Sequence, residues 1–424
     1  MMLTNHSSSR LAAAAIATVT ILNLSSPELS AGTPIVEPLE PEPAPPSALD
    51  FITKAKLTAD FRLRYEYGDQ DPLDESHAGT LRSRIGILTG KYAGFQGFVE
   101  YEGTLTADRD SYQAASVHGT GQGKTIIADP ESHELNRAWI SWTGLDSSIK
   151  VGRQRIILDN ARFVGNVGWR QNEQTYDAVT LTNSSLEDLK FFYGYINHTQ
   201  RIFGSETPAL AGQTDFDGDT HLFNVAYSGL PNATIATYAY LMDLENDAGS
   251  AASNNTYGAY IKGSVPMEPV SLGYLGEYAH QTDGGNSPLN YDTNYYHLQG
   301  SATFSKKHTF GVGYESLGEN FRTPLATLHK FNGFADKFLV TPPDGLADLY
   351  VFGGTKLPGD IGLKVAYHWF GSEGGSLEYG SEADVVLTKA INEHVSVLAK
   401  YAHYFADDFA TDTQRFSVEM NVKF

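Results

Sequence analysis

The chain ends in the ten residues Arg415-Phe-Ser-Val-Glu-Met-Asn-Val-Lys-Phe424, in which apolar and polar residues alternate. Successive side chains of an extended strand point to opposite faces, so this stretch would have one apolar and one polar face. The apolar face would carry Phe416, Val418, Met420, Val422 and Phe424. A strand at the edge of a soluble sheet would show the same pattern, so the stretch alone leaves two interpretations open.

The aromatic carboxy-terminal residue, Phe424, makes this stretch similar to the closing strand of bacterial outer-membrane β-barrels. In such a barrel the apolar face meets lipid and the polar face lines the lumen. The pattern therefore favours an all-β fold, a transmembrane antiparallel β-barrel in the outer membrane of a Gram-negative bacterium.

The composition of the 424 residues supports this fold class. The chain has 41 Gly, 24 Tyr, 22 Phe and no Cys, and its mean hydropathy is −0.29. After the first thirty residues no apolar run reaches the roughly 18 residues that a transmembrane helix needs. The lack of Cys excludes disulfides and thiolate ligands. The net charge of −20 argues against a nucleic-acid partner, which would require a basic surface.

The amino-terminal residues predict export and a tether. Arg10 precedes an apolar run, Leu11 to Leu24, and small residues follow, so we expect a signal peptide over residues 1–31 with cleavage after Ala31. Residues 32–50 are rich in Pro and Glu and should form an extended periplasmic tether, because Pro cannot donate to a sheet. We therefore expect residues 51–424 to form the barrel.

Alternating segments of about ten residues fill the rest of the chain, joined in turn by short and long connections. Short turns are expected, for example, at 183–186 and 390–393, and long polar connections at 68–78, 107–132, 199–218 and 318–345. The count is about eighteen strands, an even number with both termini on the short-turn side. The alternation of short and long connections is typical of outer-membrane barrels, which have short periplasmic turns and long extracellular loops. A barrel of this width would leave an aqueous channel unless loops fold into it.

Arginines are concentrated in the first half of the predicted barrel, where 10 of the 14 lie between Arg62 and Arg170. Alternation places those of the first two strands on the inward face. Guanidinium groups bind carboxylate and phosphate, and rings of them select anions. The candidate residues of the lumen and solute path are Arg62, Arg64, Arg82, Arg84, Arg137, Arg153, Arg170, Lys330, Asp336 and Lys337.

Acidic residues are expected on the inward face as well, so an alternative is that lumen charges merely pair and stiffen the wall. These residues are Asp60, Glu66, Asp177, Glu277, Glu315, Asp384 and Glu419. The acidic stretch 215–219 could bind a divalent cation, but it lacks the remainder of a calcium loop, and a solvated loop is the favoured interpretation. The sequence leaves open whether there is a metal site, and it indicates no cofactor.

Two long connections look too structured for surface loops. Residues 160–171 mix Arg, Trp and Gly, which suits an inward-folded constriction loop. In residues 323–338, the three phenylalanines Phe331, Phe334 and Phe338 would pack on the inner wall, while Lys330, Asp336 and Lys337 would face the solute path. Aromatic faces beside charged groups suit a carbohydrate. A plug that only narrows the pore is the alternative.

Several of these stretches resemble the alginate export family of outer-membrane porins. They are Val151-Gly-Arg-Gln154, residues 160–171 with Gly165 and Trp169, Tyr176-Asp-Ala-Val179, and above all Leu328-His-Lys-Phe-Asn-Gly-Phe-Ala-Asp-Lys-Phe338. The likeness extends from about Phe51 to Phe424. It implies a monomeric eighteen-stranded barrel with an arginine-rich lumen that passes an anionic polysaccharide or oligosaccharide. Arg153, Arg170, Lys330 and Lys337 are the lumen cations that the resemblance suggests.

The expected function is therefore a passive channel for an anionic solute, most of all an alginate-like acidic saccharide, with outer-membrane lipid and lipopolysaccharide as further partners. A general diffusion porin, or an adhesin that uses its acidic loops, are the alternatives. An enzyme is not expected, because the chain has neither a Gly-x-Ser-x-Gly elbow nor a His-Glu-x-x-His motif.

Overall fold

The computed structural model describes residues 47–115, 121–204, 215–245 and 249–424. The predicted signal peptide, and the predicted tether up to residue 46, lie outside the described residues. The described part begins with a short helix, α1 (Asp50–Thr53), and two 3-10 turns follow later, η1 (Ser250–Ala252) and η2 (Leu328–Lys330). None of the helices in the described ranges is both long and apolar enough to cross a membrane.

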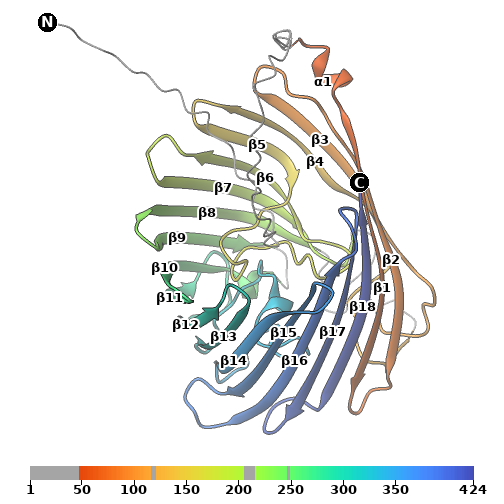
Figure 1. The fold of residues 1–424 in the computed structure, drawn as a ribbon, viewed down its shortest axis with the longest axis vertical. Helices are drawn as coiled ribbons and strands as arrows, with labels where there is room; N and C mark the ends of the chain where they lie inside the picture. Colours follow the sequence, from red (N-terminus) through yellow and green to blue (C-terminus); the bar gives the residue numbers. More distant parts are fainter. Residues whose placement is uncertain (1–46, 116–120, 205–214, 246–248) are drawn as a thin grey trace, which may run out of the picture. The chain divides into compact units, whose positions relative to one another are not determined.

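Eighteen antiparallel strands in the described residues form one closed sheet, as predicted (Figure 1). The strands are β1 (Lys56–Gln70), β2 (Ser76–Leu88), β3 (Phe95–Thr106), β4 (Ser132–Gly144), β5 (Ser147–Gln154), β6 (Thr175–Asn183), β7 (Leu189–Gln200), β8 (Asp215–Leu230), β9 (Ala233–Leu244), β10 (Asn254–Met267), β11 (Val270–Asp283), β12 (Asp292–Phe304), β13 (His308–Leu317), β14 (Leu346–Leu357), β15 (Ile361–Gly371), β16 (Glu378–Ala390), β17 (Val395–Ala406) and β18 (Thr413–Lys423).

The barrel closes between its first and last strands. β1 pairs with β18 from Asp60 opposite Lys423 to Gln70 opposite Thr413. On its other edge β1 pairs with β2. Closure leaves no strand edge with unpaired backbone groups, which a lipid environment would not tolerate.

Two predicted boundaries were wrong. The polar segment 68–78 is mostly strand, because Gly68 still pairs with Ser76 and with Arg415, so only residues 71–75 connect β1 to β2. The acidic residues Asp215 to Asp219 belong to β8 instead of a loop. In both cases the strand continues past the apolar belt with polar side chains, so polarity alone misplaced the strand ends.

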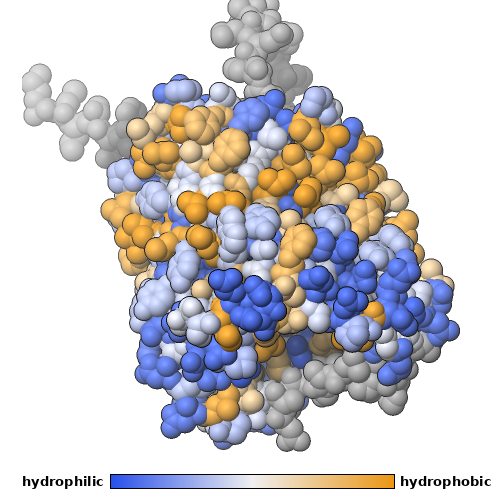
Figure 2. Space-filling model, turned by 90° about the horizontal axis from the view of Figure 1, so that it is seen from below, coloured by the Kyte–Doolittle hydropathy of each residue, from blue (hydrophilic) through white to orange (hydrophobic). Residues whose placement is uncertain are grey.

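The outward face of the strands is apolar. Leu63, Val99, Leu298, Phe310 and Val312 each expose half or more of their surface on this face. Figure 2 shows such hydrophobic side chains gathered over one half of the visible face, next to a hydrophilic zone. An apolar belt beside a polar rim is the arrangement that an outer-membrane barrel requires.

The core lies inside the barrel, because long connections between strands fold into it. Phe163, from the connection between β5 and β6, packs against Tyr238 and Tyr295 of the wall with ring centroids 5.3 and 5.4 Å apart. Phe338, from the connection between β13 and β14, packs 4.4 Å from Phe370. Figure 1 shows coil segments within the ring of strands.

We expect Leu298→Arg to destabilise the barrel, because Leu298 lies in the middle of β12 and is 59% exposed on the outward face. Arginine at the bilayer midplane should lower the free energy of unfolding by about 2–4 kcal/mol. Urea unfolding in phospholipid vesicles, followed by Trp fluorescence, measures this change. The matched control Ser301→Arg, on the inward face of the same strand, should cost less than about 1 kcal/mol. Equal losses in both variants would contradict the assignment of the faces.

Candidate functional site

Two connections fold into the lumen and bind each other there. We call residues 155–174 the first inner loop and residues 318–345 the second inner loop. The Gly165 amide donates to the Leu325 carbonyl at 2.8 Å, and the Thr327 amide donates to the Ala161 carbonyl at 3.0 Å. Their phenylalanines Phe163 and Phe321 meet with ring centroids 6.1 Å apart. The prediction that residues 160–171 fold inward is confirmed.

Two arginines of β1 hold the first inner loop against the wall. Arg62 donates to the carbonyls of residues 168–170 at 3.0 to 3.1 Å. Arg64 donates to the Trp169 carbonyl and, at 2.7 Å, to Glu419 on β18. The Arg64 side chain is fully buried. Both guanidinium groups therefore bind protein atoms, and Arg64 has no surface left for a solute.

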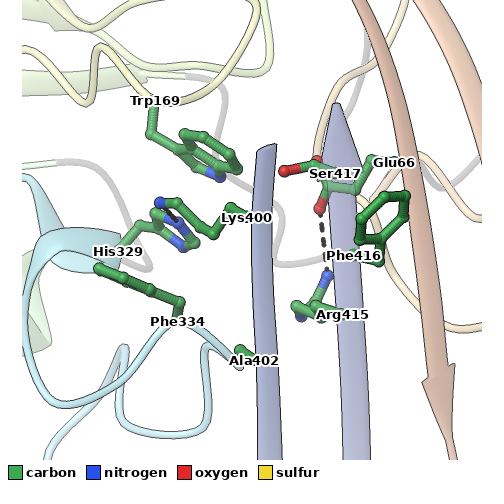
Figure 3. A pocket seen from close by; sticks show the side chains of 9 residues that line it. All are labelled: Glu66, Trp169, His329, Phe334, Lys400, Ala402, Arg415, Phe416 and Ser417. Atoms are coloured by element: carbon green, nitrogen blue, oxygen red, sulfur yellow. Dashed lines mark hydrogen bonds and ion pairs between the residues drawn. The ribbon is translucent and has the colours of Figure 1, made fainter. Parts of the chain in front are cut away.

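Trp169 is enclosed by cations and rings (Figure 3). The Arg64 guanidinium lies 4.1 Å from the centre of the indole, and the Lys400 ammonium of β17 lies 3.6 Å from it. His329 of the second inner loop stacks on the indole at 4.5 Å with an angle of 7°. A cavity of about 10 Å³ remains among these groups, enough for about one water molecule. Side chains of both inner loops and of the wall therefore pack closely around Trp169.

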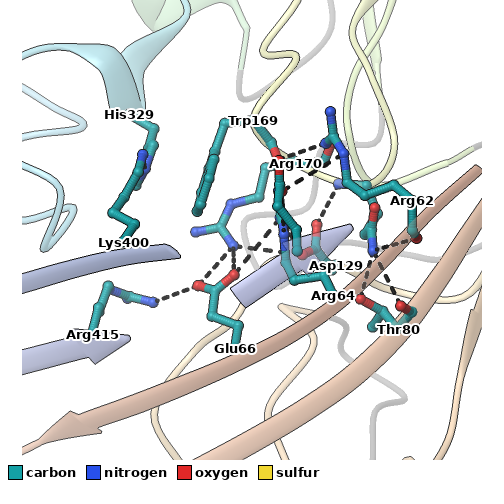
Figure 4. A network of polar contacts seen from close by, with 12 residues as sticks. Arg62, Arg64, Glu66, Thr80, Asp129, Trp169, Arg170, His329, Lys400 and Arg415 are labelled. Atoms are coloured by element: carbon teal, nitrogen blue, oxygen red, sulfur yellow. Dashed lines mark hydrogen bonds and ion pairs between the residues drawn. The ribbon is translucent and has the colours of Figure 1, made fainter. Parts of the chain in front are cut away.

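Arg170 is the centre of an ion-pair network that joins both loops to the wall (Figure 4). It lies 3.2 Å from Glu66 of β1 and 2.8 Å from Asp336 of the second inner loop. Asp129, from the connection between β3 and β4, lies 3.8 Å away. Burial would lower the pKa of Arg170, but these carboxylates raise it above its usual value, so the guanidinium stays charged. Arg415 of β18 binds the same Glu66 at 3.4 Å.

His329 and Asp336 form a buried pair within the second inner loop. The distance from His329 Nδ1 to Asp336 Oδ1 is 2.6 Å, and that from His329 Nε2 to the Lys400 ammonium is 2.8 Å. Burial lowers the pKa of His329 to about 3, so the ring is neutral at pH 7. Because an ionised Asp336 and an ammonium flank the ring, Nδ1 donates to Asp336 and Nε2 accepts from Lys400. The His329 ring therefore links Asp336 to Lys400, and this contact attaches the second inner loop to β17.

The other inward arginines of the predicted set are paired too. Arg137 binds Glu100 through two bonds of 2.8 and 2.7 Å. The remaining pairs are Arg82 with Asp60, and Arg84 with Glu102 and Glu173. The alternative that lumen charges pair and stiffen the wall therefore describes this sector of the barrel.

Arg153 was predicted to line the lumen, but it lies on the outer face of the barrel. It shares a strand face with Val151, which is 44% exposed toward lipid, whereas its neighbour Gln154 is buried inside. Its guanidinium binds Asp177 at 2.7 and 2.8 Å on that outer face. Both residues were expected to line the lumen, and the register of β5 turns them outward.

Asp336 and its neighbours differ from the predicted arrangement as well. The Asp336 side chain is 4% exposed and bound to Arg170 and His329, so it does not face an open solute path. Lys337 lies next to it, and burial lowers its pKa to about 8. Lys330 is exposed, and its ammonium donates to the Asn160 carbonyl at 2.6 Å.

Besides Lys400, two inward lysines near Lys330 escaped the sequence prediction. Lys262 shares the inward face of Tyr260, and Lys364 shares that of His368; both lysines are exposed within the barrel. Their charges act on Lys330: burial lowers the pKa of Lys330, and Lys364 and Lys262 lower it further. Among the described residues no carboxylate lies within ion-pair distance of these three lysines. Strand alternation could have placed both missed residues in the lumen.

A pocket of about 360 Å³ adjoins this basic group. Phe334 of the second inner loop, Phe352 and Val386 give it an apolar lining, and Lys364 and Asp384 provide charged groups. It is far larger than the cavity beside Trp169. An apolar surface with a few charged groups is the usual character of a small-molecule site.

The acidic stretch at the start of β8 lies against a histidine. Asp217 binds His198 at 2.7 Å, and together with Asp215 these residues offer ligand atoms within 4.8 Å of one another. Asp217 is 59% exposed, which fits the predicted solvated group better than a built metal site.

The fold matches solved outer-membrane channels over nearly their whole length. OccAB4 of Acinetobacter baumannii has a TM-score of 0.70 at 14% identity, covering 87% of this chain and 98% of that one. OpdK of Pseudomonas aeruginosa, solved with vanillate, has a TM-score of 0.67 at 13% identity, covering 88% and 99%. Comparison with curated proteins gives no match.

The closed barrel, its apolar belt and its inner loops define an outer-membrane channel of the porin class. Residues 53–326, more than half of the chain, match the family described as Alginate export. The protein belongs to this family, as its sequence indicated. The stretch Leu328 to Phe338, which seemed the most specific part of the likeness, lies just beyond the matched residues.

We expect Asp336→Asn to loosen the second inner loop, because the amide cannot balance the charge of Arg170. The loss should be about 1.5–3 kcal/mol, the contribution of a hydrogen bond to a charged group. Limited proteolysis within residues 318–345 should then be faster than in the wild type. Asp344→Asn, at an exposed position of the same loop, is the control and should leave the rate unchanged. Equal rates in all three proteins would contradict the anchoring role.

The same anchor should resist mild acid. Burial would raise the pKa of Asp336, but His329 and Arg170 outweigh it and hold the pKa below its usual value. A carboxylate with a depressed pKa stabilises the fold above its unfolded pKa, about 3.9, and loses this effect only as the pH falls through the folded value. Between pH 7 and pH 5 the loop should lose only the protection that His329 accounts for, because this ring is neutral in the fold, with a pKa of about 3, but takes up a proton below about 6.5 once the loop opens. In His329→Gln, hydrogen exchange of residues 318–345, corrected for intrinsic rates, should therefore be equally protected at both pH values, and a loss of protection at pH 5 in this variant would contradict the prediction.

Proposed function

We propose that this channel passes a small anionic solute, foremost an acidic oligosaccharide of the uronate type, past a lysine cluster formed by Lys262, Lys330 and Lys364. The observation that carries the proposal is the contrast between cations with and without an ion pair. The inward arginines form ion pairs with carboxylates, whereas the three lysines are exposed and have no carboxylate within ion-pair distance in the described residues, although Lys330 also donates to the Asn160 carbonyl. Positive charge open to the lumen is what selects an anion.

The repulsion within the lysine cluster supports this assignment. Burial lowers the pKa of Lys330, and the neighbouring charges of Lys364 and Lys262 lower it further, so the three cations repel one another. A carboxylate placed among the three ammonium groups would remove this repulsion. An uncharged solute would not, so the cluster should discriminate by charge.

The pocket beside the cluster suits the rest of such a solute. Phe334 and Phe352 present aromatic rings to it, and Lys364 lies at its edge. Aromatic rings pack against the apolar faces of sugar or aromatic rings, while the lysine meets a carboxylate. The relative OpdK was solved with vanillate, an aromatic carboxylate, which supports the view that this fold accommodates small organic anions.

We expect the triple variant of Lys262, Lys330 and Lys364 to glutamine to lose anion selectivity. In planar bilayers under a salt gradient, the reversal potential of the wild type should indicate anion preference, and uronate oligomers should block the current. The variant should reduce the anion-to-cation permeability ratio and the blocking affinity at least several-fold. The control variant Lys306→Gln with Lys307→Gln removes exposed charges from the turn after β12 and should behave like the wild type. A cation-selective wild type that ignores uronates would indicate a general diffusion porin instead.

A further inference from the structure

A separate sector of the inner wall, on β3 and β4, holds a row of oxygen-bearing side chains. Glu102 lies opposite Glu134, and Thr104 lies opposite Ser132. Side chains directly opposite on antiparallel strands have Cβ atoms about 4.5–5.5 Å apart. Asn172, from the first inner loop, lies within interaction distance of the Glu134 carboxylate, although no hydrogen bond of normal geometry joins the two side chains. Carboxylate, amide and hydroxyl oxygens therefore converge on one place.

The charges in this sector do not balance. With the neighbouring pair Arg82–Asp60 included, its five carboxylates are Asp60, Glu100, Glu102, Glu134 and Glu173, and its four guanidinium groups are Arg82, Arg84, Arg137 and Arg155. Each arginine is engaged by a carboxylate other than Glu134: the pairs are Arg82 with Asp60, Arg84 with Glu102 and Glu173, Arg137 with Glu100, and Arg155 with Glu173. One negative charge, that of Glu134, is left over.

Glu134 is buried and has no hydrogen-bond donor. It is 7% exposed, and neither of its carboxylate oxygens has a partner among the described residues. The atoms Ser132 Oγ, Thr104 Oγ1 and Asn172 Oδ1 nearby are also buried and without a partner, and so is Asn136 Oδ1, two residues further along the inward face of β4. A buried charge without a partner is strongly unfavourable. A group that satisfies the oxygens around Glu134 at once, those of Ser132, Thr104 and Asn172, must be a cation or a donor of several hydrogen bonds.

We propose that Glu134 and its neighbours form a calcium site on the inner wall. Calcium takes six to eight oxygen ligands, including carboxylates, amide carbonyls and water. The carboxylate of Glu134 and the oxygens of Asn172, Ser132 and Thr104, completed by water, would provide this set without any nitrogen or sulfur ligand. The bound ion cancels the surplus charge of the sector and joins the first inner loop, through Asn172, to β4. This role is independent of the lysine cluster and of the solute.

The test is titration calorimetry of the protein refolded from inclusion bodies in detergent, stripped with EDTA and free of lipopolysaccharide. Calcium chloride should bind the wild type with a stoichiometry near one and raise the midpoint of thermal unfolding. Magnesium should bind at least tenfold more weakly, because it prefers a smaller octahedral shell that keeps its waters. Absence of calcium binding to the folded wild type would overturn the proposal.

Two variants locate the site. Glu134→Gln keeps the shape of the side chain, removes the unpaired charge and should fold at least as well as the stripped wild type, while calcium affinity falls at least tenfold. Asn172→Ala keeps the charge and should weaken binding less. Asp217→Asn alters the exposed group with His198 and should leave the affinity unchanged. If Asp217→Asn abolishes binding, or Glu134→Gln binds like the wild type, the site lies elsewhere and the proposal is wrong.

Discussion

The constraint on which the structure depends is the closure of β1 against β18. Backbone groups that face lipid have no water to bind, so a membrane sheet must end by pairing with its own beginning. Here the seam also sets the chemistry of the interior. Register brings Arg64 of β1 opposite Glu419 of β18, and Arg415 of β18 reaches Glu66. Several of the charged groups that hold the inner loops therefore lie on the two strands that complete the barrel, and these groups come together only once the barrel has closed.

Arginine and lysine have different roles inside this barrel. The planar guanidinium groups of Arg62, Arg64 and Arg170 each bind several carbonyl or carboxylate oxygens, and these contacts fix the inner loops in place. A guanidinium group has five N–H donors in a rigid plane, which suits such fixed, multidentate contacts. The lysine ammonium is a point charge at the end of a flexible chain. The inward lysines that remain exposed are the groups that can meet a passing solute. A wall of rigid pairs facing a few mobile cations would combine stability with weak, reversible binding.

Much of the fold could be predicted from sequence because alternation is a local signal. The strand count, closure and inward folding of residues 160–171 followed from period-two patterns and loop composition. The partners of the arginines could not be predicted in this way, because Arg170 binds residues 104 and 166 positions away in the chain. Arg153 shows the limit of the method: its sequence context is basic, but a register in which Gln154 points inward turns it toward the membrane. Lys262 and Lys364 are isolated basic residues in their strands, so no cluster of charge marks them, although strand alternation places both on the inward face.

The net charge of −20 does not conflict with an anion path. At about 0.1 M salt, charges separated by more than about 10 Å are largely screened by solvent. Acidic residues such as Asp217 are exposed at strand ends, and many others are neutralised inside by arginines. A solute within the lumen therefore responds chiefly to the groups closest to it. On the proposed path past Lys330 those groups would be three ammonium ions, which would make the local potential positive in spite of the negative charge of the whole protein.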